Sequence, residues 1–289
     1  MNQCSTIALT KIPGIKTTTL HEKGEVCYLT YDRLDGMEGL CNAFSTRLGG
    51  VSKYPFGPMN LSFTIGDDPS CVQENFRRMG EAMGVLPEQM VYSHQTHTNH
   101  VMVVGKEHLG MGILKERSFH DVDGIITNVP GVCLVTSYAD CVPLYVVDPK
   151  KRVIGLSHSG WKGTVGDIGG NTVRMMESTY GCDPKDLVAA IGPSIGVECY
   201  EVSEDVAEKF RPHYSKEEQE KIILPGGTPG KYQLNLQQAC VYNFLHAGME
   251  LHKIILPDLC TACNSTVLHS HRKSGGRRGG MCAFFMLQE

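Results

Sequence analysis

The chain has 289 residues, of which 41% are hydrophobic and 20% charged, and its formal net charge at pH 7 is −4. This balance is typical of a globular protein with a full hydrophobic core, and it excludes a disordered chain or a small disulfide scaffold. A slightly acidic chain also disfavours binding to nucleic acid or to an anionic membrane, because both partners need a basic face.

The twelve cysteines are too few for a disulfide framework in a chain of this length, and several fall in apolar runs. We therefore expect buried free thiols and a reducing, cytoplasmic compartment. The N-terminal residues show no signal-peptide pattern. The longest apolar stretch, 129–147, is interrupted by Asp140 and two prolines, so we expect no membrane span.

The first half of the chain predicts mostly strands and one clear helix. The helix is expected to have Asp68 as its N-cap and Pro69 at its first position, and to stop at Gly84. Short apolar runs predict strands over 26–32, 42–46, 90–93, 101–104, 125–127, 132–137, 144–147 and 153–156.

The second half mixes helices and strands. Helical patterns are expected over about 170–180, 203–210 and 235–247, and strands over 188–191, 252–256, 266–270 and 281–287. A charged, Pro/Gly-rich stretch at about 215–230 is expected to be a surface insertion. Because strands and helices do not alternate strictly, we expect an α+β (mixed α/β) fold. We expect a single domain, 1–289, with more than one mixed β-sheet flanked by helices.

Cys141 and His158 flank a predicted hairpin. Strands 144–147 and 153–156 are joined by Asp148-Pro149-Lys150-Lys151, which has turn chemistry. If Val147 faces Arg152, Cys141 lies directly opposite His158, with Cβ atoms about 4.5–5.5 Å apart. At that distance the two side chains can share a metal ion or form a nucleophile–base pair. A Cys and a His at a sheet edge with no shared task is the third interpretation.

Three histidines, His94, His97 and His100, lie between two predicted strands. Any one of them could complete a Cys/His/His set, which leaves the fourth tetrahedral position open, as catalytic zinc requires. The alternative is that they are solvated loop residues.

A rival metal site is Cys260-x2-Cys263 followed by His269 and His271. Cys-x2-Cys is a known zinc-ligand spacing, but the two histidines do not have the usual separation. Free thiols near a cleft are the alternative interpretation.

Two basic segments are candidates for anion binding. Arg47 leaves a strand into a Leu-Gly-Gly turn, which can present a guanidinium and backbone N–H groups to phosphate. The loop 273–278 is basic and flexible, and it is either solvated or meets an anionic ligand.

Eight motifs occur in order between Asn42 and Leu287: FSTRLGGVS at 44–52, NLS at 60–62 with GDD at 66–68, QTH at 95–97, DGIIT at 123–127, ADCVP at 139–143, HSGWKG at 158–163, IGPSI at 191–195 with CYEV at 199–202, and CTAC at 260–263. Together they resemble the laccase-domain family, also called YfiH-type or multicopper polyphenol-oxidase-like. Its members include bacterial purine nucleoside phosphorylases.

The resemblance implies a metal site of His97, Cys141 and His158. It also implies catalytic roles for Arg47, Cys141 and His158, and substrate contacts from Arg47 and Asn60. Near the C-terminus the chain departs from the family pattern, because Leu268 replaces an aromatic residue and Gly279-Gly280 stands where Gly-Arg is usual. Arg277 and Arg278 are candidates to substitute there.

The function that the resemblance implies is zinc-dependent phosphorolysis of adenosine, inosine, guanosine and methylthioadenosine, with adenosine deamination. The expected partners are a small-molecule purine nucleoside and phosphate, and zinc is preferred over copper as the metal. A three-ligand zinc can lower the pKa of water to about 7 for attack on C6 of adenine.

Two alternatives remain open. One is a metal-free Cys–His hydrolase or amidase acting on a peptidoglycan precursor or another small amide. The other is a copper-dependent phenol oxidase, although the dispersed histidines do not resemble several copper centres. The sequence does not indicate the oligomeric state.

Overall fold

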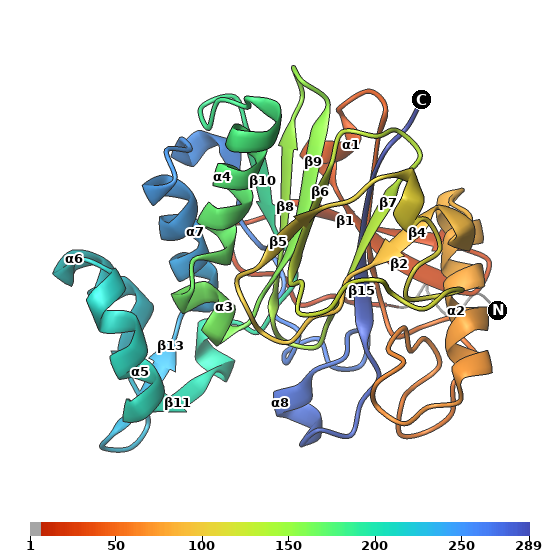
Figure 1. Cartoon of the computed structure of the whole chain (residues 1–289). Helices are drawn as coiled ribbons and strands as arrows, with labels where there is room; N and C mark the ends of the chain where they lie inside the picture. The colour runs from red at the N-terminus through yellow and green to blue at the C-terminus, as the bar shows by residue number, and fades with distance from the viewer. Residues whose placement is uncertain (1–6) are drawn as a thin grey trace.

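The computed structural model describes residues 7–289. Two six-stranded sheets pack against each other, and helices cover their outer faces (Figure 1). A third, three-stranded sheet lies to one side with two short helices. The α+β prediction with more than one mixed sheet is confirmed.

The first sheet is covered by helix α2 on its outer face. Its strand order is β1-β2-β3-β15-β7-β4, with β1 Thr18–Lys23, β2 Val26–Tyr31, β3 Leu40–Ser45, β15 Met281–Leu287, β7 Cys133–Tyr138 and β4 Met90–Tyr92. Helix α2, Pro69–Met83, begins and ends as predicted: the Asp68 side chain accepts from the Ser70 N–H, and Gly84 adopts φ 73. The ring of Phe76 packs against Phe284 of the sheet.

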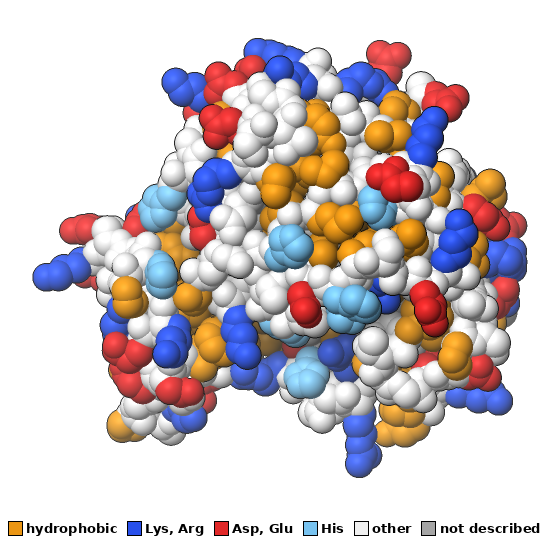
Figure 2. Space-filling model, in the orientation of Figure 1, with side chains coloured by type: hydrophobic (Ala, Val, Ile, Leu, Met, Phe, Trp, Pro, Cys, Tyr) orange, Lys and Arg blue, Asp and Glu red, His pale blue; other side chains and the backbone are white. Residues whose placement is uncertain are grey.

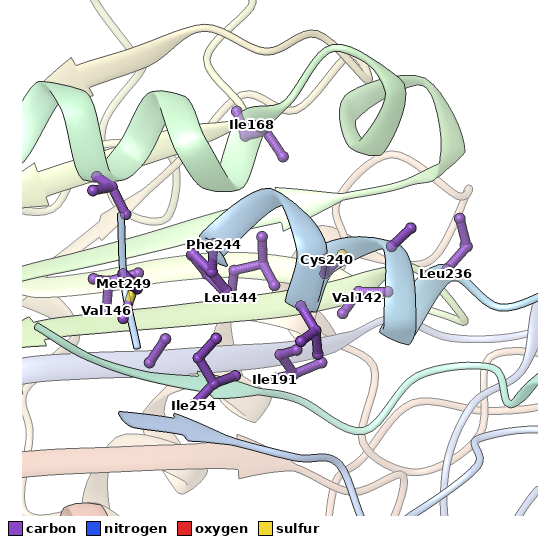
Figure 3. Close-up of a cluster of buried hydrophobic side chains, with 14 of the residues drawn as sticks. Val142, Leu144, Val146, Ile168, Ile191, Leu236, Cys240, Phe244, Met249 and Ile254 are labelled. Atoms are coloured by element: carbon purple, nitrogen blue, oxygen red, sulfur yellow. The ribbon is translucent and has the colours of Figure 1, made fainter. Parts of the chain in front are cut away.

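The second sheet carries the predicted hairpin. Its order is β14-β10-β8-β9-β6-β5, with β14 Ile254–Ile255, β10 Val188–Ile191, β8 Val142–Asp148, β9 Val153–Ser159, β6 Gly124–Thr127 and β5 Val101–Val103. Helices α4 (Ile168–Tyr180) and α7 (Leu236–His246) cover its outer face. In Figure 3, Phe244 and Cys240 of α7 pack against Leu144 and Ile191 of the sheet.

Aromatic side chains fill the space between the two sheets. Tyr145 of β8 makes edge contacts with Tyr31 and with Phe285, each at a centroid distance of 5.3 Å. Its hydroxyl donates to the Ala43 carbonyl at 2.7 Å, so the buried polar atom is paired across the interface. These contacts hold the two sheets in position relative to each other.

The segment 215–230 is more regular than a loop. It contains α6, Lys216–Ile222, which starts with a Ser215/Glu218 capping box, and β12, Ile223–Pro225. Strand β12 pairs with β13 (Lys231–Leu234), which pairs with β11 (Glu201–Ser203), and helix α5 (Glu204–Phe210) follows β11. Its status as an insertion stays a prediction.

Several predicted elements are wrong or incomplete. Residues 266–270 form turns rather than a strand, because the N–H groups of Val267 and Leu268 both donate to the Asn264 carbonyl. The strand predicted over 252–256 is reduced to β14. Four elements were not predicted: β1, the short helices α1 (Asp32–Asp35) and α8 (His271–Ser274), and α3 (Trp161–Val165), which lies within a glycine-rich stretch.

Among residues 7–289, ten cysteines are free, as expected, but Cys27 is disulfide-bonded, so the expectation of free thiols is wrong for this residue. Every helix within residues 7–289 is too short or too polar to span a bilayer.

Candidate metal centre

The β8/β9 hairpin brings Cys141 and His158 together, although not in the predicted register. Pro143, rather than Cys141, faces His158. The slip is two residues, and because side chains alternate along a strand with a period of two, Cys141 and His158 remain on one face.

The turn explains the slip. Asp148 stays in the ladder opposite Val153, and its Oδ1 accepts from the N–H groups of Lys150 and Lys151. The turn therefore comprises residues 149–152 and closes with Arg152 at φ 52. Because the Asp148 side chain forms this Asx turn, it favours a turn over residues 149–152 rather than over 148–151.

His97 is the histidine of the 94–100 loop that reaches Cys141. Its Nε2 lies 4.0 Å from the Cys141 Sγ, and its ring centroid lies 4.9 Å from that of His158. Ligand atoms of His97, Cys141 and His158 all lie within 4.8 Å of one another. We call these three residues the trio. His97 adopts φ 65, a left-handed conformation that is uncommon for a non-glycine residue.

The two other histidines of this loop are engaged elsewhere. His94 Nδ1 accepts from the Asp121 N–H at 3.2 Å, and His100 Nδ1 lies 3.0 Å from the Asp121 carbonyl oxygen. They hold the loop around Asp121, and His97 alone of the three lies at the trio.

Asp123, just before β6, holds both His158 and the backbone of the loop that carries His97 through hydrogen bonds. It is fully buried and lies 2.8 Å from Nδ1 of His158, which leaves Nε2 of that ring for the trio. Its two carboxylate oxygens also accept from the backbone N–H groups of residues 96, 97 and 98 at 2.9–3.0 Å. A carboxylate behind a ligating histidine is the usual support of a metal site.

Charge in the site favours ionised groups. Burial raises the pKa of Asp123, but hydrogen bonds from His158 and from the loop N–H groups outweigh it and bring the pKa down to about 2. Burial also raises the pKa of Cys141, but the charge and hydrogen bonding of His158 and His97 lower it to about 6. Burial lowers the pKa of His158, whereas the Cys141 thiolate and Asp123 raise it to about 9.

The trio fits a zinc ion. One thiolate and two imidazoles are a borderline-soft donor set, and three protein ligands leave one position open. The space for these side chains depends on Gly160, where a Cβ would lie 2.8 Å from Cδ2 of His97 and 3.1 Å from Sγ of Cys141.

A pocket of about 280 Å³ opens beside the trio. It is lined by His97, Asp140, Cys141, Trp161, Lys162, Ile195, Tyr200 and Leu236. Its volume lies just below the ~300–1,000 Å³ range of small-molecule sites. Histidine side chains gather near the middle of the molecular face shown in Figure 2. Trp161 and Tyr200 place aromatic side chains in the lining of this pocket, next to the polar ligands.

Two half-buried guanidinium groups, of Arg47 and Arg278, both act on the buried ring of His269, and Arg278 also interacts with the charge of Cys141. Burial lowers the pKa of Arg278, while the charges of Cys141 and Asp140 raise it. Burial and the charges of Arg47 and Arg278 bring the pKa of His269 to about 3, so His269 stays neutral between them.

Neither guanidinium has a carboxylate partner within residues 7–289. Arg47 donates to the Ser265 carbonyl at 2.7 Å, and Arg278 donates to the Gly279 carbonyl at 3.1 Å. The Nε of Arg278 is buried and has no hydrogen-bond partner among the described residues. Uncompensated cationic donors of this kind are suited to an anion.

Asn60 is fully buried and its amide is completely used. Its Nδ2 donates to the Ser62 carbonyl and to Asp67, while its Oδ1 accepts from the N–H groups of Ser62 and Gly280. Asn60 thus ties the 60–67 loop to the start of β15, and its predicted contact with substrate stays a prediction.

The rival Cys/His site has a different composition from the one predicted. His269 is buried and its Nε2 lies 3.1 Å from the Met59 carbonyl oxygen, and His271 is exposed at the start of α8. Instead, Cys199 joins Cys260 and Cys263 in a second group of close ligand atoms.

Sequence reasoning gave no role to Asp123 and did not pair Cys199 with the Cys-x2-Cys motif. For Asp123 there was a signal, an acidic residue separated by only Gly124 from the predicted strand 125–127. Strand β6 pairs with β9 so that Gly124 faces Ser157, which brings the preceding Asp123 beside His158.

Comparisons with known proteins agree with this fold. The family model of the multi-copper polyphenol oxidoreductase laccase matches residues 41–288. The chain is 35% identical over 252 residues to purine nucleoside phosphorylase YlmD of Geobacillus stearothermophilus, with coverage of 87% of this chain and 91% of that protein. It is 30% identical over 251 residues to adenosine deaminase RL5 of an unknown prokaryotic organism, covering 86% of this chain and 94% of that one.

The crystal structure of YlmD from Geobacillus stearothermophilus has a TM-score of 0.87 to this chain at 32% identity. The match covers 94% of this chain and 100% of the crystallised chain. The resemblance inferred from the motifs is confirmed.

Proposed function

The chain belongs to the multi-copper polyphenol oxidoreductase laccase family, and from this premise we propose that it is a zinc-dependent purine nucleoside phosphorylase that also deaminates adenosine. The proposed nucleosides are adenosine, inosine, guanosine and methylthioadenosine, with inorganic phosphate as the second substrate. The observation that carries the proposal is the convergence of His97, Cys141 and His158 on one point beside a pocket with aromatic walls.

The trio would hold the zinc ion. When bound, zinc supplies Lewis acidity, which acidifies water and polarises polar groups of a substrate. Asp123 keeps His158 in the tautomer that presents Nε2 to the site, and its hydrogen bonds to the backbone at 96–98 fix His97 at the same time. One buried carboxylate therefore positions both imidazoles.

The aromatic walls would bind the purine ring. Trp161 begins α3 one residue after β9 of the second sheet. Tyr200 follows the 3-10 turn Val197–Cys199, and its carbonyl accepts from the Leu234 N–H of β13 in the third sheet, so elements of two sheets hold the two rings. Stacking on such rings is worth about 1–3 kcal/mol per base and does not distinguish one purine from another. A broad nucleoside range follows from recognition of this kind.

The two guanidiniums would hold phosphate. In phosphorolysis a phosphate oxygen attacks C1′ of the ribose while the bond from C1′ to the base breaks, so a dianion must sit beside the sugar. Arg278 offers an unused buried Nε–H, and Arg47 adds a second positive charge, since both guanidiniums act on neutral His269. Charged donors fixed in advance stabilise the charge that develops during the reaction.

Zinc-loaded protein incubated with inosine should release hypoxanthine only when phosphate is present, and with adenosine it should give adenine, inosine and hypoxanthine. Both activities should be lost in Cys141→Ala and after removal of metal by a chelator, and restored to wild-type protein by zinc. Cys71→Ala, on the half-buried part of helix α2, is the matched control and should retain activity. Phosphate-dependent turnover by fully metal-free protein would contradict the proposal.

A second candidate is favoured by the lowered pKa of Cys141. A thiolate beside an imidazolium is the ground state of a cysteine nucleophile, so metal-free protein could act as a hydrolase or amidase on a peptidoglycan precursor or another small amide. Elemental analysis separates the two candidates, because a zinc-bound thiolate is a poor nucleophile. Amide hydrolysis that zinc inhibits would favour the second.

We do not extend the proposal to phenol oxidation by copper. Within residues 7–289, only one group of neighbouring ligand atoms includes histidine, whereas oxidases that reduce dioxygen to water generally use several copper centres with more imidazole ligands.

A further inference from the structure

Three cysteines outside the trio form a compact group. Cys199 ends the 3-10 turn η4, Val197–Cys199, while Cys260 and Cys263 belong to the turn after β14. Their Sγ atoms all lie within 4.8 Å of one another, and those of Cys199 and Cys263 are 3.6 Å apart. We call these three residues the thiol cluster. Neither the trio nor the pocket beside it uses any of them.

The spacing of the sulfurs suits a shared metal ion. Metal–thiolate bonds of about 2.3 Å place the sulfurs of a tetrahedral or trigonal site about 3.8–4.0 Å apart. The Cys199–Cys263 separation of 3.6 Å is close to this value, and no pair of the three sulfurs is more than 4.8 Å apart, so each side chain needs only a small adjustment. A disulfide between Cys199 and Cys263 would need an S–S distance of about 2.0 Å and would leave Cys260 unused.

The surroundings of the cluster favour thiolate ligands once a cation is present. The backbone N–H of Gly196 donates to Sγ of Cys260 at 3.1 Å. Burial raises the pKa of the Cys263 thiol, and the positive charge of Lys273 opposes this shift. Without a cation, burial and the neighbouring sulfurs raise the pKa of Cys199 to about 12.

The open side of the cluster faces a cavity of about 460 Å³ that is separate from the pocket beside the trio. All three cysteines line this cavity, together with Glu198 and Gln238. A fourth ligand from solvent or from a small molecule therefore has room to reach the ion.

We propose that Cys199, Cys260 and Cys263 form a second metal site, which binds one soft d10 cation, Zn²⁺ or Cu⁺, through three thiolates. Soft sulfur donors without imidazole or carboxylate select these two ions among common metals. The ion joins η4 to the turn at 260–263, and it thereby steadies Tyr200, which directly follows Cys199 and lines the pocket beside the trio.

The test is metal stoichiometry in protein reduced and handled without oxygen. Wild-type protein loaded with Zn²⁺ and passed through a desalting column should retain two equivalents. Cys263→Ser and Cys199→Ser should each retain one, Cys141→Ala should retain one, and Cys71→Ser should retain two. Cys263 is exposed, so its substitution is the variant least expected to disturb folding.

Two further measurements identify the ligands and the ion. In Cys141→Ala, added Co²⁺ should give a thiolate-to-cobalt charge-transfer band that disappears in Cys141→Ala/Cys263→Ser. Competition with a Cu⁺ chelator should show one tightly held Cu⁺ that the Cys199 and Cys263 variants lose. Binding of either ion supports the proposal, and comparison of the two affinities says which is preferred.

The proposal is overturned if wild-type protein holds a single ion that only Cys141→Ala loses. It is also overturned if Cys199 and Cys263 are isolated as a disulfide and their reduction creates no additional Zn²⁺ or Cu⁺ site.

Discussion

Gly160 provides the sharpest test of the candidate metal centre. It stands between β9 and α3 with φ −75, a conformation that alanine adopts without strain. Gly160→Ala therefore adds a single methyl group to an unchanged backbone. That methyl carbon would lie 2.8 Å from Cδ2 of His97 and 3.1 Å from Sγ of Cys141, so it presses on two ligands at once.

The size of the effect follows from the distances. Carbon atoms in contact are normally about 3.5–4.0 Å apart, so the His97 ring must withdraw by roughly 0.7–1.2 Å. Metal–ligand distances tolerate only about ±0.2 Å. Loss of a residue that merely supports a ligand typically weakens metal binding about 10–100-fold. Because this substitution displaces the ligands themselves, we expect Zn²⁺ affinity to fall at least about 100-fold, or ~2.8 kcal/mol.

Competition with a chromophoric Zn²⁺ chelator measures this change directly in the Cys263→Ser background, where only the trio binds. The thermal unfolding of metal-free protein should be nearly unaffected, because the exposed side chain of His97 can rotate away while its backbone stays held by Asp123. Gly36→Ala is the control: Gly36 has φ −73 and a Cβ there would lie 3.7 Å from the nearest atom. If Gly160→Ala binds Zn²⁺ as tightly as Gly36→Ala does, the trio is not the metal centre.

Three other predictions concern the groups around the trio. Asp123→Asn should weaken Zn²⁺ binding about 10–100-fold, because the amide cannot replace the charge behind His158; unchanged affinity in a chelator competition would contradict the role given to Asp123. In metal-free protein, the rate of Cys141 alkylation should rise with pH through a midpoint near pH 6, since the thiolate exists above its lowered pKa. Peptide mass spectrometry measures this rate. A midpoint above pH 8 would rule out the thiolate–imidazolium pair. Arg278→Gln should raise the KM for phosphate about 10–100-fold, as expected for loss of a charged hydrogen bond. It should leave adenosine deamination unchanged, because that reaction uses no phosphate. Equal loss of both activities in product-resolved assays would place Arg278 elsewhere in the mechanism.

The hairpin shows how far local sequence patterns determined the site. The apolar runs on both sides of Asp148 specified two antiparallel strands, and the polar residues between them specified a turn. They did not specify whether Asp148 lies in the turn or in the ladder. That choice depends on the hydrogen bonds from the N–H groups of Lys150 and Lys151. The prediction of a shared face survived because the error was an even number of residues.

The choice among the three loop histidines could not come from periodicity. His94 and His100 are bound to Asp121, a residue 21 or more positions away, and His97 reaches the trio through a left-handed backbone conformation. Neither feature has a local sequence signal, so the residue pattern left the three equivalent. Only the family resemblance selected His97. The pairing of Cys199 with Cys263 is likewise a contact between segments 64 residues apart.

Backbone conformation at the trio shows that the fold holds its ligands under constraint. His97 has φ 65 and Asp140, next to Cys141, has φ 91, so the loops that carry two of the three ligands contain left-handed non-glycine residues. Such conformations cost about 1–3 kcal/mol each and persist only where surrounding bonds determine them.

Those bonds are visible for both residues. The His97 N–H donates to buried Asp123, and the Asp140 carboxylate accepts from the Thr261 hydroxyl at 2.6 Å and from the Arg272 N–H at 2.7 Å. Thr261 lies between Cys260 and Cys263, so the turn that carries the thiol cluster also restrains the residue beside Cys141. A cation in the thiol cluster would stiffen this turn, and the geometry of the trio would become more precise without any direct contact between the two metal sites.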